Sequence, residues 1–280
     1  MDARTADLER AWQRAMQRLF DRQLDAVLAR LEGKRGRQML RDSTVAPDAS
    51  QVFDTAFWTS ETAQVVDDLY SQVVHVSATA QVAAVGGDFK MTDSWVRKMI
   101  EQRVQKLSPQ VTDTTYKGIK RALADGVSEG EGIPELSKRI HGLFTQTYAN
   151  RAETVARTEV ISAYNGTAQR FAVENPDVAG LEWIATLDSR TRLSHAALDG
   201  TIIHKGGAFQ VDGATLSFPG DPNVSGVPDP GSVIINCRCT VAPVLMADMP
   251  EGMQQPQQVQ DVEAAAAAQR SEERRVGKEC

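Results

Sequence analysis

Long helical patterns fill the first 173 residues of this 280-residue chain and constrain its fold more than any other feature. Between residues 6 and 31, apolar residues recur every three or four positions, which is the spacing of one face of an α-helix. We therefore predict one long amphipathic helix that ends near Gly33. A second helical stretch covers about residues 52–84, although its segment VVHVSATAQVAAV also contains β-branched residues that suit a strand.

Four further helices are expected before the first convincing strand. One of them fits residues 92–107. Proline suits the first helical position, so Ser108-Pro109 predicts that a separate helix begins there, and Pro134 predicts another start in the same way. The last of these helices covers about residues 149–173, before the segment ENPDVAG.

Short strand-like segments replace the helices after Pro176. LEWIATL is typical of a strand and SRTRLSHAAL of a short helix, whereas AFQVDGATLSF predicts two strands joined at Asp212-Gly213, a favoured hairpin turn. The expected fold class is therefore α+β. A mostly helical N-terminal two-thirds is followed by a small α+β module with antiparallel strands.

These patterns divide the chain into regions. Residues 1–107 are expected to form a helical N-terminal region that contacts other molecules. Residues 108–246 are expected to form a second unit, in which helices at 109–173 precede the α+β module at 177–246.

The C-terminal residues 247–280 are rich in Gln, Ala and Glu and cannot bury a core, so we expect a disordered tail. Its final segment SEERRVGKEC, residues 271–280, looks like a translated vector or adapter scar, which would make Cys280 irrelevant to function. No apolar run approaches the roughly 18 to 20 residues needed to span a bilayer, and the N-terminus lacks the apolar core of a signal peptide. We therefore expect no membrane association.

Charge is distributed unevenly along the chain. The net charge of −6 argues against a protein that coats nucleic acid with its whole surface, because phosphate neutralisation needs clustered basic residues. Residues 1–41 nevertheless carry ten basic groups against six acidic ones. The basic end of this region could contact phosphate or an acidic protein surface, or it could be the solvated cationic end of a helix. The residues concerned are Lys34, Arg35, Arg37 and Arg41.

The densest group of ionisable residues lies in WIATLDSRTRLSHAALDG, residues 183–200. If Asp188 or its neighbour caps a short helix, Asp188, Arg192, His195 and Asp199 share one helix face at spacings of three or four. His195 could then be a general base oriented by Asp199, or a metal ligand. The alternative is an ion-pair network that pins the helix to the strands.

Two of the three cysteines, Cys237 and Cys239, flank an arginine in the segment INCRC. On an extended strand their side chains point to the same face, so both sulfurs could meet one metal ion. With His195 and His204 they would supply the two sulfurs and two nitrogens of a zinc-like site. The alternative is a pair of buried free thiols, because free cysteine is among the most buried residue types.

The segment ARTEVISAYNG, residues 156–166, places Thr158, Ser162 and Asn165 along one side of a helix. Such a polar stripe indicates a face that receives hydrogen bonds from another segment, although a plain amphipathic helix explains it equally well. Residues 129–131 have the E-x-E spacing of some ADP-ribosyl transferases, but an acidic glycine-rich loop is usually a solvated turn. No phosphate-binding loop motif occurs, so nucleotide-driven chemistry has no support.

Five motifs occur in a characteristic order: EGIPELSKRI, RAETVARTEVISAYNGTAQRF, WIATLDSRTRLSHAALDG, FPGDP and NCRC. Together they resemble the phage Mu F-like minor head, or head morphogenesis, family over about residues 118–244. The helices before this span resemble the family only in being helical. Among the matching positions, we expect one structural cluster of side chains: Arg157, Glu159, Asn165, Trp183, Asp188, Arg190, Arg192, His195, Asp199, Asn236 and Arg238.

The resemblance implies an assembly protein of tailed double-stranded DNA phages that is present in few copies. It implies a location at the portal vertex or in the head interior of the virion, and in the host cytoplasm during assembly. The implied partners are the portal protein and, in addition, scaffold or capsid proteins and phage DNA. No catalytic mechanism comes with the family, so we expect no enzyme and no catalytic residues.

Within this resemblance, the cluster is expected to lock the proline-rich loop after Phe218 and the last strand onto the small helix, and a structural zinc ion fits the same picture. Two enzymatic alternatives remain open. One is a metal-dependent hydrolase or nuclease that uses His195 and the cysteines, and the other is an ADP-ribosyl transferase-like toxin module.

Overall fold

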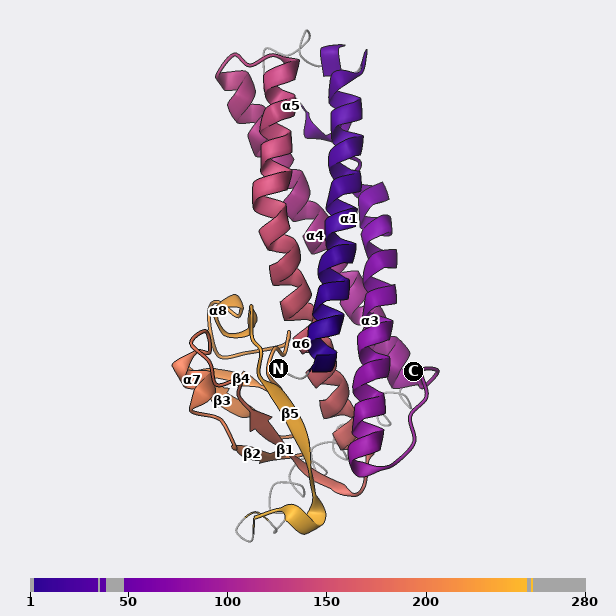
Figure 1. Cartoon of the computed structure of the whole chain (residues 1–280), viewed down its shortest axis with the longest axis vertical. Helices are drawn as coiled ribbons and strands as arrows, with labels where there is room; N and C mark the ends of the chain where they lie inside the picture. Colours follow the sequence, from indigo (N-terminus) through magenta and orange to yellow (C-terminus); the bar gives the residue numbers. More distant parts are fainter. Residues whose placement is uncertain (1–2, 35, 39–47, 251–252, 254–280) are drawn as a thin grey trace, which may run out of the picture.

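The computed structural model describes residues 3–34, 36–38, 48–250 and 253. Its longest helices form the bundle in Figure 1: α1 (Ala3–Glu32), α3 (Thr55–Val85), α4 (Ser94–Ser128) and α6 (Ala149–Glu174). The shorter elements of this part are η1 (Ala49–Gln51), α5 (Ile133–Gly142) and the π-helical turn η2 (Leu143–Tyr148). The predicted helical N-terminal two-thirds is thus confirmed. None of the described helices has both the length and the apolar character that crossing a membrane requires.

Burial of one face of each helix explains why the bundle forms. Trp12, Met16 and Leu19 of α1 are fully buried, at the three- and four-residue spacing seen in the sequence. α1 packs on α6, and α3 packs on both α4 and α6. The part of α3 that also suited a strand is helical, because Val73 and Val74 are buried among these neighbours and packing overrides the β-branched preference.

Helix α4 is continuous where two helices were expected. Pro109 lies inside it, so the prediction that a new helix begins at this proline is wrong. A proline inside a helix removes one backbone hydrogen bond and costs about 3 kcal/mol. Leu107 and Val111 on either side of it are buried in the bundle core, and this unbroken apolar face offsets the cost. The expected region boundary after residue 107 falls within this helix, and the division into regions stays a prediction.

A buried ion pair joins three helices inside the bundle. Arg103 of α4 donates through Nε to Glu159 Oε2 of α6 at 2.8 Å, and the Tyr70 hydroxyl of α3 donates to the same oxygen at 2.7 Å. Burial, and next the negative charge of Glu159, raises the pKa of Tyr70 well above its usual value. Glu159 is only 4% exposed, so these hydrogen bonds replace the water that its carboxylate loses.

The chain beyond α6 folds as a small α+β module. Its three-stranded antiparallel sheet has β1 (Val178–Ile184) in the centre, between β2 (Ile202–His204) and β5 (Thr240–Leu245). β3 (Phe209–Val211) and β4 (Ala214–Leu216) form a separate hairpin. The remaining elements are α7 (Leu193–Ala196), α8 (Gly231–Ile234) and η3 (Met246–Asp248). The predicted α+β class with antiparallel strands is thus confirmed.

The hairpin turn lies at the predicted position. Asp212 and Gly213 join β3 to β4, and their φ angles are 50° and 80°. A two-residue hairpin turn of this kind needs positive φ at both positions, which glycine adopts without steric cost and aspartate tolerates. The turn chemistry of the sequence therefore fixes this hairpin locally.

Helix α6 belongs to both halves of the molecule. Its residues Ala156 and Val160 pack in the core of the bundle, whereas Ala168 and Ala172 pack in the core of the module together with Trp183. In Figure 1 the module lies beside the end of the bundle where α1 begins and where α6 leads into β1. The module is thus built directly on a helix of the bundle.

Two local expectations for the module are wrong. Helix α7 covers four residues and has Arg192 as its N-cap, so Asp188 does not cap it. The segment with Cys237 and Cys239 precedes β5 and is not part of that strand. Both differences arise because contacts between distant loops, described below, replace the local helix and strand.

Replacement Glu159→Gln is expected to destabilise the fold by about 3–5 kcal/mol, because it leaves the largely buried Arg103 without its carboxylate. The matched control is Glu174→Gln, which removes a carboxylate from an exposed ion pair with Arg170 on the same helix. The control should cost less than about 1 kcal/mol. Chemical denaturation followed by circular dichroism measures both changes, and equal costs would contradict the role of the buried pair.

Candidate functional site

Three side chains able to bind a metal meet inside the module: His195, Cys237 and Cys239. His195 Nδ1 lies 3.5 Å from the Cys237 sulfur and 3.8 Å from the Cys239 sulfur. His195 and Cys239 are 2% exposed and Cys237 is 1% exposed. We call this group the thiol–histidine cluster. It brings together three of the four side chains that the sequence analysis considered as metal ligands.

His204, the fourth of those side chains, lies outside the cluster. It is half-buried on β2, where it pairs with Gly180 of β1. The central strand β1 separates β2 from β5, so the chain does not bring His204 to the cysteines that precede β5. Within the part of the chain that the structure describes, the cluster has three members.

The two thiols of the cluster differ in acidity. A hydrogen bond with Cys237, supported by a second one with His195, lowers the pKa of Cys239 to about 5. The same hydrogen bond, together with burial, raises the pKa of Cys237 well above its usual value. The thiolate form is therefore favoured at Cys239 over Cys237. Because metal ions bind the thiolate form, the lowered pKa of Cys239 favours metal binding at this sulfur.

The distances in the cluster fit a tetrahedral metal site. Zinc bonds of about 2.3 Å to sulfur and about 2.0 Å to nitrogen, at tetrahedral angles, place the two ligand atoms roughly 3.6 Å apart. The observed separations of 3.5 and 3.8 Å are close to this value. The His195 ring also contacts Trp183 in a T-shaped arrangement, with 5.4 Å between centroids, which fixes its orientation. These three residues could therefore hold a metal ion.

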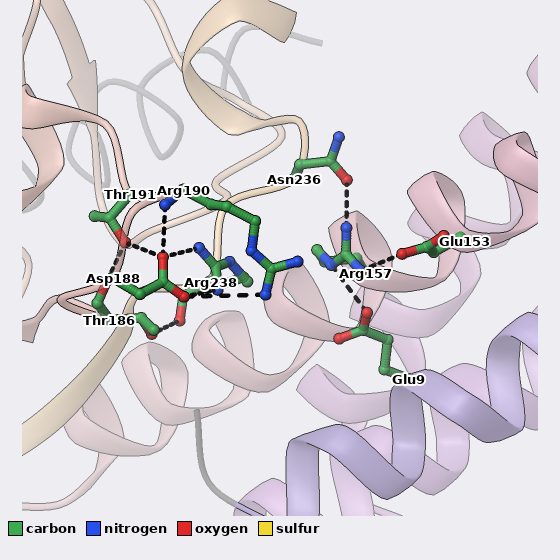
Figure 2. A network of polar contacts seen from close by, with 9 residues as sticks. All are labelled: Glu9, Glu153, Arg157, Thr186, Asp188, Arg190, Thr191, Asn236 and Arg238. Carbon is green, nitrogen blue, oxygen red and sulfur yellow. Dashed lines mark hydrogen bonds and ion pairs between the residues drawn. The ribbon is translucent and has the colours of Figure 1, made fainter.

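An ion pair beside the cluster ties the loop before α7 to the INCRC segment (Figure 2). Asp188 accepts hydrogen bonds from the Arg238 guanidinium at 2.5 Å and from the Arg190 backbone N–H at 2.8 Å. Thr186 donates its hydroxyl to the Arg238 carbonyl at 2.7 Å. The hydrogen bond from Arg238 is the main reason that the pKa of Asp188 lies well below its usual range. Asp188 is thus a fixed negative charge that holds the two loops together.

Arg157 of α6 is the second centre in Figure 2. Its guanidinium donates to Glu9 of α1 at 2.9 Å, to Glu153 at 2.6 Å and to the side-chain oxygen of Asn236 at 3.3 Å. The Asn236 backbone N–H donates to the Thr158 hydroxyl at 3.1 Å. Asn236 has a φ of 59°, a left-handed conformation that asparagine tolerates better than most residues. The turn before the cysteines is therefore fixed to α6.

Asn165 connects α6 to two further segments through their backbones. Its side-chain nitrogen donates to the carbonyls of Pro219 and Cys239, each at 2.9 Å. Its side-chain oxygen accepts from the Val241 N–H at 3.3 Å. Asn165 is fully buried, and its contacts agree with the interpretation of this face as one that hydrogen-bonds to another segment.

The shared ionic helix face expected in residues 183–200 does not form. Arg192 donates to the Ile235 carbonyl at 2.8 Å, and Asp199 accepts from the Ala185 N–H at 2.8 Å. Asp188 and His195 contact Arg238 and the cysteines instead, so the four side chains have separate partners. The prediction is wrong because only a single turn of this segment is helical.

The basic residues after α1 are only partly described. Arg35 and Arg41 lie outside the described residues. Lys34 and Arg37 follow the end of α1, and the Arg37 guanidinium donates to the Glu32 carbonyl at 2.8 Å. A cation at this position stabilises the C-terminal end of a helix, which agrees with the structural alternative considered for this segment.

Sequence reasoning missed several partners that complete these networks. Glu9 pairs with a residue 148 positions away, and Arg103 pairs with one 56 positions away. Pairs so distant leave no spacing signal in a single sequence. Thr186 is close in sequence to Asp188 of its network. Its role nevertheless follows only from its hydrogen bond to the Arg238 carbonyl, 52 positions away.

Residues 117–242 match the family model described as Phage Mu protein F like protein. This span begins in α4 and ends in β5, so it contains the thiol–histidine cluster, Asn165 and all of the network in Figure 2 except Glu9. Over residues 117–242 the chain is therefore similar to the Phage Mu protein F-like family, in the region that its motifs indicated.

Among curated proteins, the chain is distantly similar to the minor head protein GP7 of Bacillus phage SPP1, with 30% identity over 164 residues, 55% of this chain and 51% of GP7. It is also 26% identical over 161 residues to the uncharacterized protein YqbB of Bacillus subtilis, covering 56% of this chain and 51% of YqbB. A third relative is the NAD(+)--arginine ADP-ribosyltransferase EFV of Enterococcus faecalis, with 27% identity over 153 residues, 54% of this chain and 30% of EFV.

The chain spans about half the length of GP7 and of YqbB, and less than a third of EFV. No solved structure matches it. The chain is thus similar to the Mu F-like family and distantly homologous to GP7, a protein named as a minor head protein.

Replacement Asp188→Asn is expected to lower the melting temperature at neutral pH, because the Arg238 side chain, only 8% exposed, loses its carboxylate. A carboxyl with a lowered pKa stabilises the fold above its unfolded-state pKa of about 3.9 and loses this effect as the pH falls towards its folded-state pKa. The difference in melting temperature between wild type and variant should thus be constant above about pH 5 and shrink below about pH 4.

Differential scanning calorimetry across this pH range measures the effect. The matched control Asp212→Asn changes a carboxylate in the exposed hairpin turn, where asparagine is equally suited to positive φ, and should leave the melting temperature unchanged. A difference for Asp188→Asn that persists undiminished to the acid limit of folding would contradict the prediction.

Proposed function

We propose that the protein is a minor head component of a tailed double-stranded DNA phage or prophage, and that it acts in head morphogenesis in association with the portal. The observation that carries the proposal is the match of residues 117–242 to the Mu F-like family, together with the similarity to a protein named as a minor head protein. The location that follows is the portal vertex or the head interior, and the host cytoplasm during assembly.

The contacts made by residues of the family motifs also agree with a structural role. Three residues of these motifs form hydrogen bonds with other parts of the same chain: Arg157, Asn165 and Asn236. The Asp188–Arg238 pair likewise joins two loops of the module. Side chains engaged in this way stabilise a shape, which is what an assembly protein requires of its central unit.

The proposed contacts fall on different regions of the chain. We assign the contacts with portal, scaffold or capsid proteins mainly to residues 1–107, and the head-morphogenesis unit to residues 108–246. Contact with phage DNA, during packaging or ejection, is assigned to the basic residues after α1: Lys34, Arg35, Arg37 and Arg41. DNA binding through these residues would weaken steeply with added salt.

An enzymatic function has less support. A metal-dependent hydrolase or nuclease needs an open metal position that a substrate can reach, whereas each member of the thiol–histidine cluster is at most 2% exposed. Glu129 and Glu131 of the E-x-E segment both accept hydrogen bonds from Arg139, at 2.6 and 2.9 Å, which explains them as a structural turn. The similarity to EFV covers 30% of that protein, so we assign no transferase residues here.

We further propose that the thiol–histidine cluster binds one structural zinc ion through His195 Nδ1 and the two sulfurs. The support is the distances from His195 Nδ1 to the two sulfurs, which fit a tetrahedral site, and the lowered pKa of Cys239. A metal at this position would join α7 to the INCRC segment, beside the Asp188–Arg238 pair that joins the same two parts of the module.

Heads and procapsids purified from cells that produce the phage should contain the chain in few copies, and it should co-sediment with the portal protein. Deletion of its gene should reduce the yield of DNA-filled heads. Quantitative mass spectrometry and electron microscopy measure these two effects. A chain that is absent from purified heads and procapsids, with normal heads formed without it, would refute the proposed function.

Untagged protein should contain about one zinc ion per chain by elemental analysis, and the double variant Cys237→Ser, Cys239→Ser should lose it and melt at a lower temperature. His195→Ala should have the same effect, whereas the matched control His204→Ala should keep the metal because His204 lies outside the cluster. An enzyme would instead lose activity on His195→Ala without a change in melting temperature. Metal-free wild type with the stability of the double variant would rule out the zinc proposal.

A further inference from the structure

A groove with a cavity volume of about 690 Å³ runs between α4 and α6, where the loop after β4 crosses them. Trp95, Lys98, Gln102 and Lys106 line it at the three- and four-residue spacing of one face of α4. Phe218 of the loop lines it as well. The groove is distinct from the thiol–histidine cluster, none of whose members lines it.

The FPGDP motif builds one wall of this groove. Asn165 holds the Pro219 carbonyl at 2.9 Å, which fixes the loop next to α6. Phe218 packs over Gly166, where a Cβ would lie 3.2 Å from its ring, so the absence of a side chain makes room for the phenyl group. Lys106 reaches the Pro222 carbonyl at 3.4 Å from α4. The motif therefore has a use beyond joining two parts of the module: it positions an aromatic ring in the groove.

The charge of the groove is positive. Its lining contains Lys98, Arg103, Lys106 and Arg170, and no aspartate or glutamate. Arg103 and Arg170 have carboxylate partners on α6. Lys98 and Lys106 are exposed and have no carboxylate partner within the described ranges. Eight residues of helix separate these two lysines by about 12 Å along α4, so two uncompensated cations follow one groove of a chain whose net charge is −6.

The surface near these lysines is apolar and aromatic. Trp95, Met99 and Phe218 line the groove and are each half-buried, which leaves part of their apolar surface open to solvent. A ligand that covers this surface gains from apolar burial as well as from charge. An acidic polypeptide segment with interspersed apolar side chains supplies both. Duplex DNA supplies only phosphates, and it is too wide to enter a groove between two neighbouring helices.

We propose that this groove docks an acidic, amphipathic segment of another protein of the head. Carboxylates of the segment pair with Lys98 and Lys106, and its apolar side chains cover Met99, Trp95 and Phe218. The chemistry of the segment follows from the charges and rings of the groove, whereas its origin in a head protein rests on the proposed function.

Site-specific photo-crosslinking tests the proposal in cells that assemble the phage. A photo-reactive amino acid replaces Gln102, which lines the groove, and in a matched control it replaces Gln105, which is exposed on α4 but does not line the groove. Mass spectrometry then identifies the crosslinked molecule. The expected result is a crosslink from position 102, and not from 105, to a protein segment of net negative charge. Crosslinks to nucleic acid, or equal crosslinking from both positions, would overturn the proposal.

Charge reversal provides the second arm of the test. Lys98→Glu with Lys106→Glu should weaken the crosslink from position 102 by at least about tenfold, and lysines in place of the carboxylates of the identified segment should restore it. The matched control Arg97→Glu with Arg121→Glu makes the same change in net charge at exposed positions of α4 outside the groove. It should keep the crosslink within about twofold. Equal losses in the two variants, or no restoration by the lysines, would contradict the docking mode.

The outcomes also separate this inference from the proposed function. If position 102 crosslinks to an acidic segment but the chain is absent from purified heads, docking in the groove is supported and the proposed role in the head is refuted. If the chain is present in heads but position 102 crosslinks to no acidic segment, the proposed role in the head is supported and docking in the groove is refuted.

Discussion

One buried side-chain amide, that of Asn165, determines how the module is held on the bundle. It makes hydrogen bonds to the backbones of two segments that follow it by 54 and 74 residues. Neither segment is paired in a sheet at these points, so the amide replaces the ladder that a strand would supply. Each of its groups is buried, and leaving one of them unpaired would cost about 1–3 kcal/mol. The position of Phe218 in the groove and that of the cysteines beside His195 both depend on this residue.

Helix α6 makes the bundle and the module one mechanical unit. The same helix carries Glu159 inside the bundle, Arg157 at the junction with α1, and Asn165 under the module. A load on the module is therefore transmitted to α1 and α4 through charged and hydrogen-bonded contacts that few rotamers satisfy. Such a connection keeps the module and the bundle in a fixed arrangement.

Local patterns made the secondary structure largely predictable. The buried stripe of Trp12, Met16 and Leu19 and the hairpin at Asp212-Gly213 each follow from neighbours in sequence. The helix start predicted at Pro109 is wrong, because burial of the residues around it outweighs the preference of proline for the first turn of a helix. The family motifs identified residues that lie in the networks, but not which residues they contact. Asp188 was expected on a helix face with His195 and instead holds Arg238, 50 positions away, which no spacing rule indicates.

The antiparallel sheet has a consequence for the order in which the chain is made. Its central strand β1 pairs with β5, so Trp183 cannot pair with Val241 until Val241 has been synthesised. Until then one edge of β1 has no partner, although every long helix of the bundle has already been synthesised. The module therefore completes in one late step, after the bundle. A copy of the chain that stops before β5 retains an open strand edge, which favours aggregation or degradation.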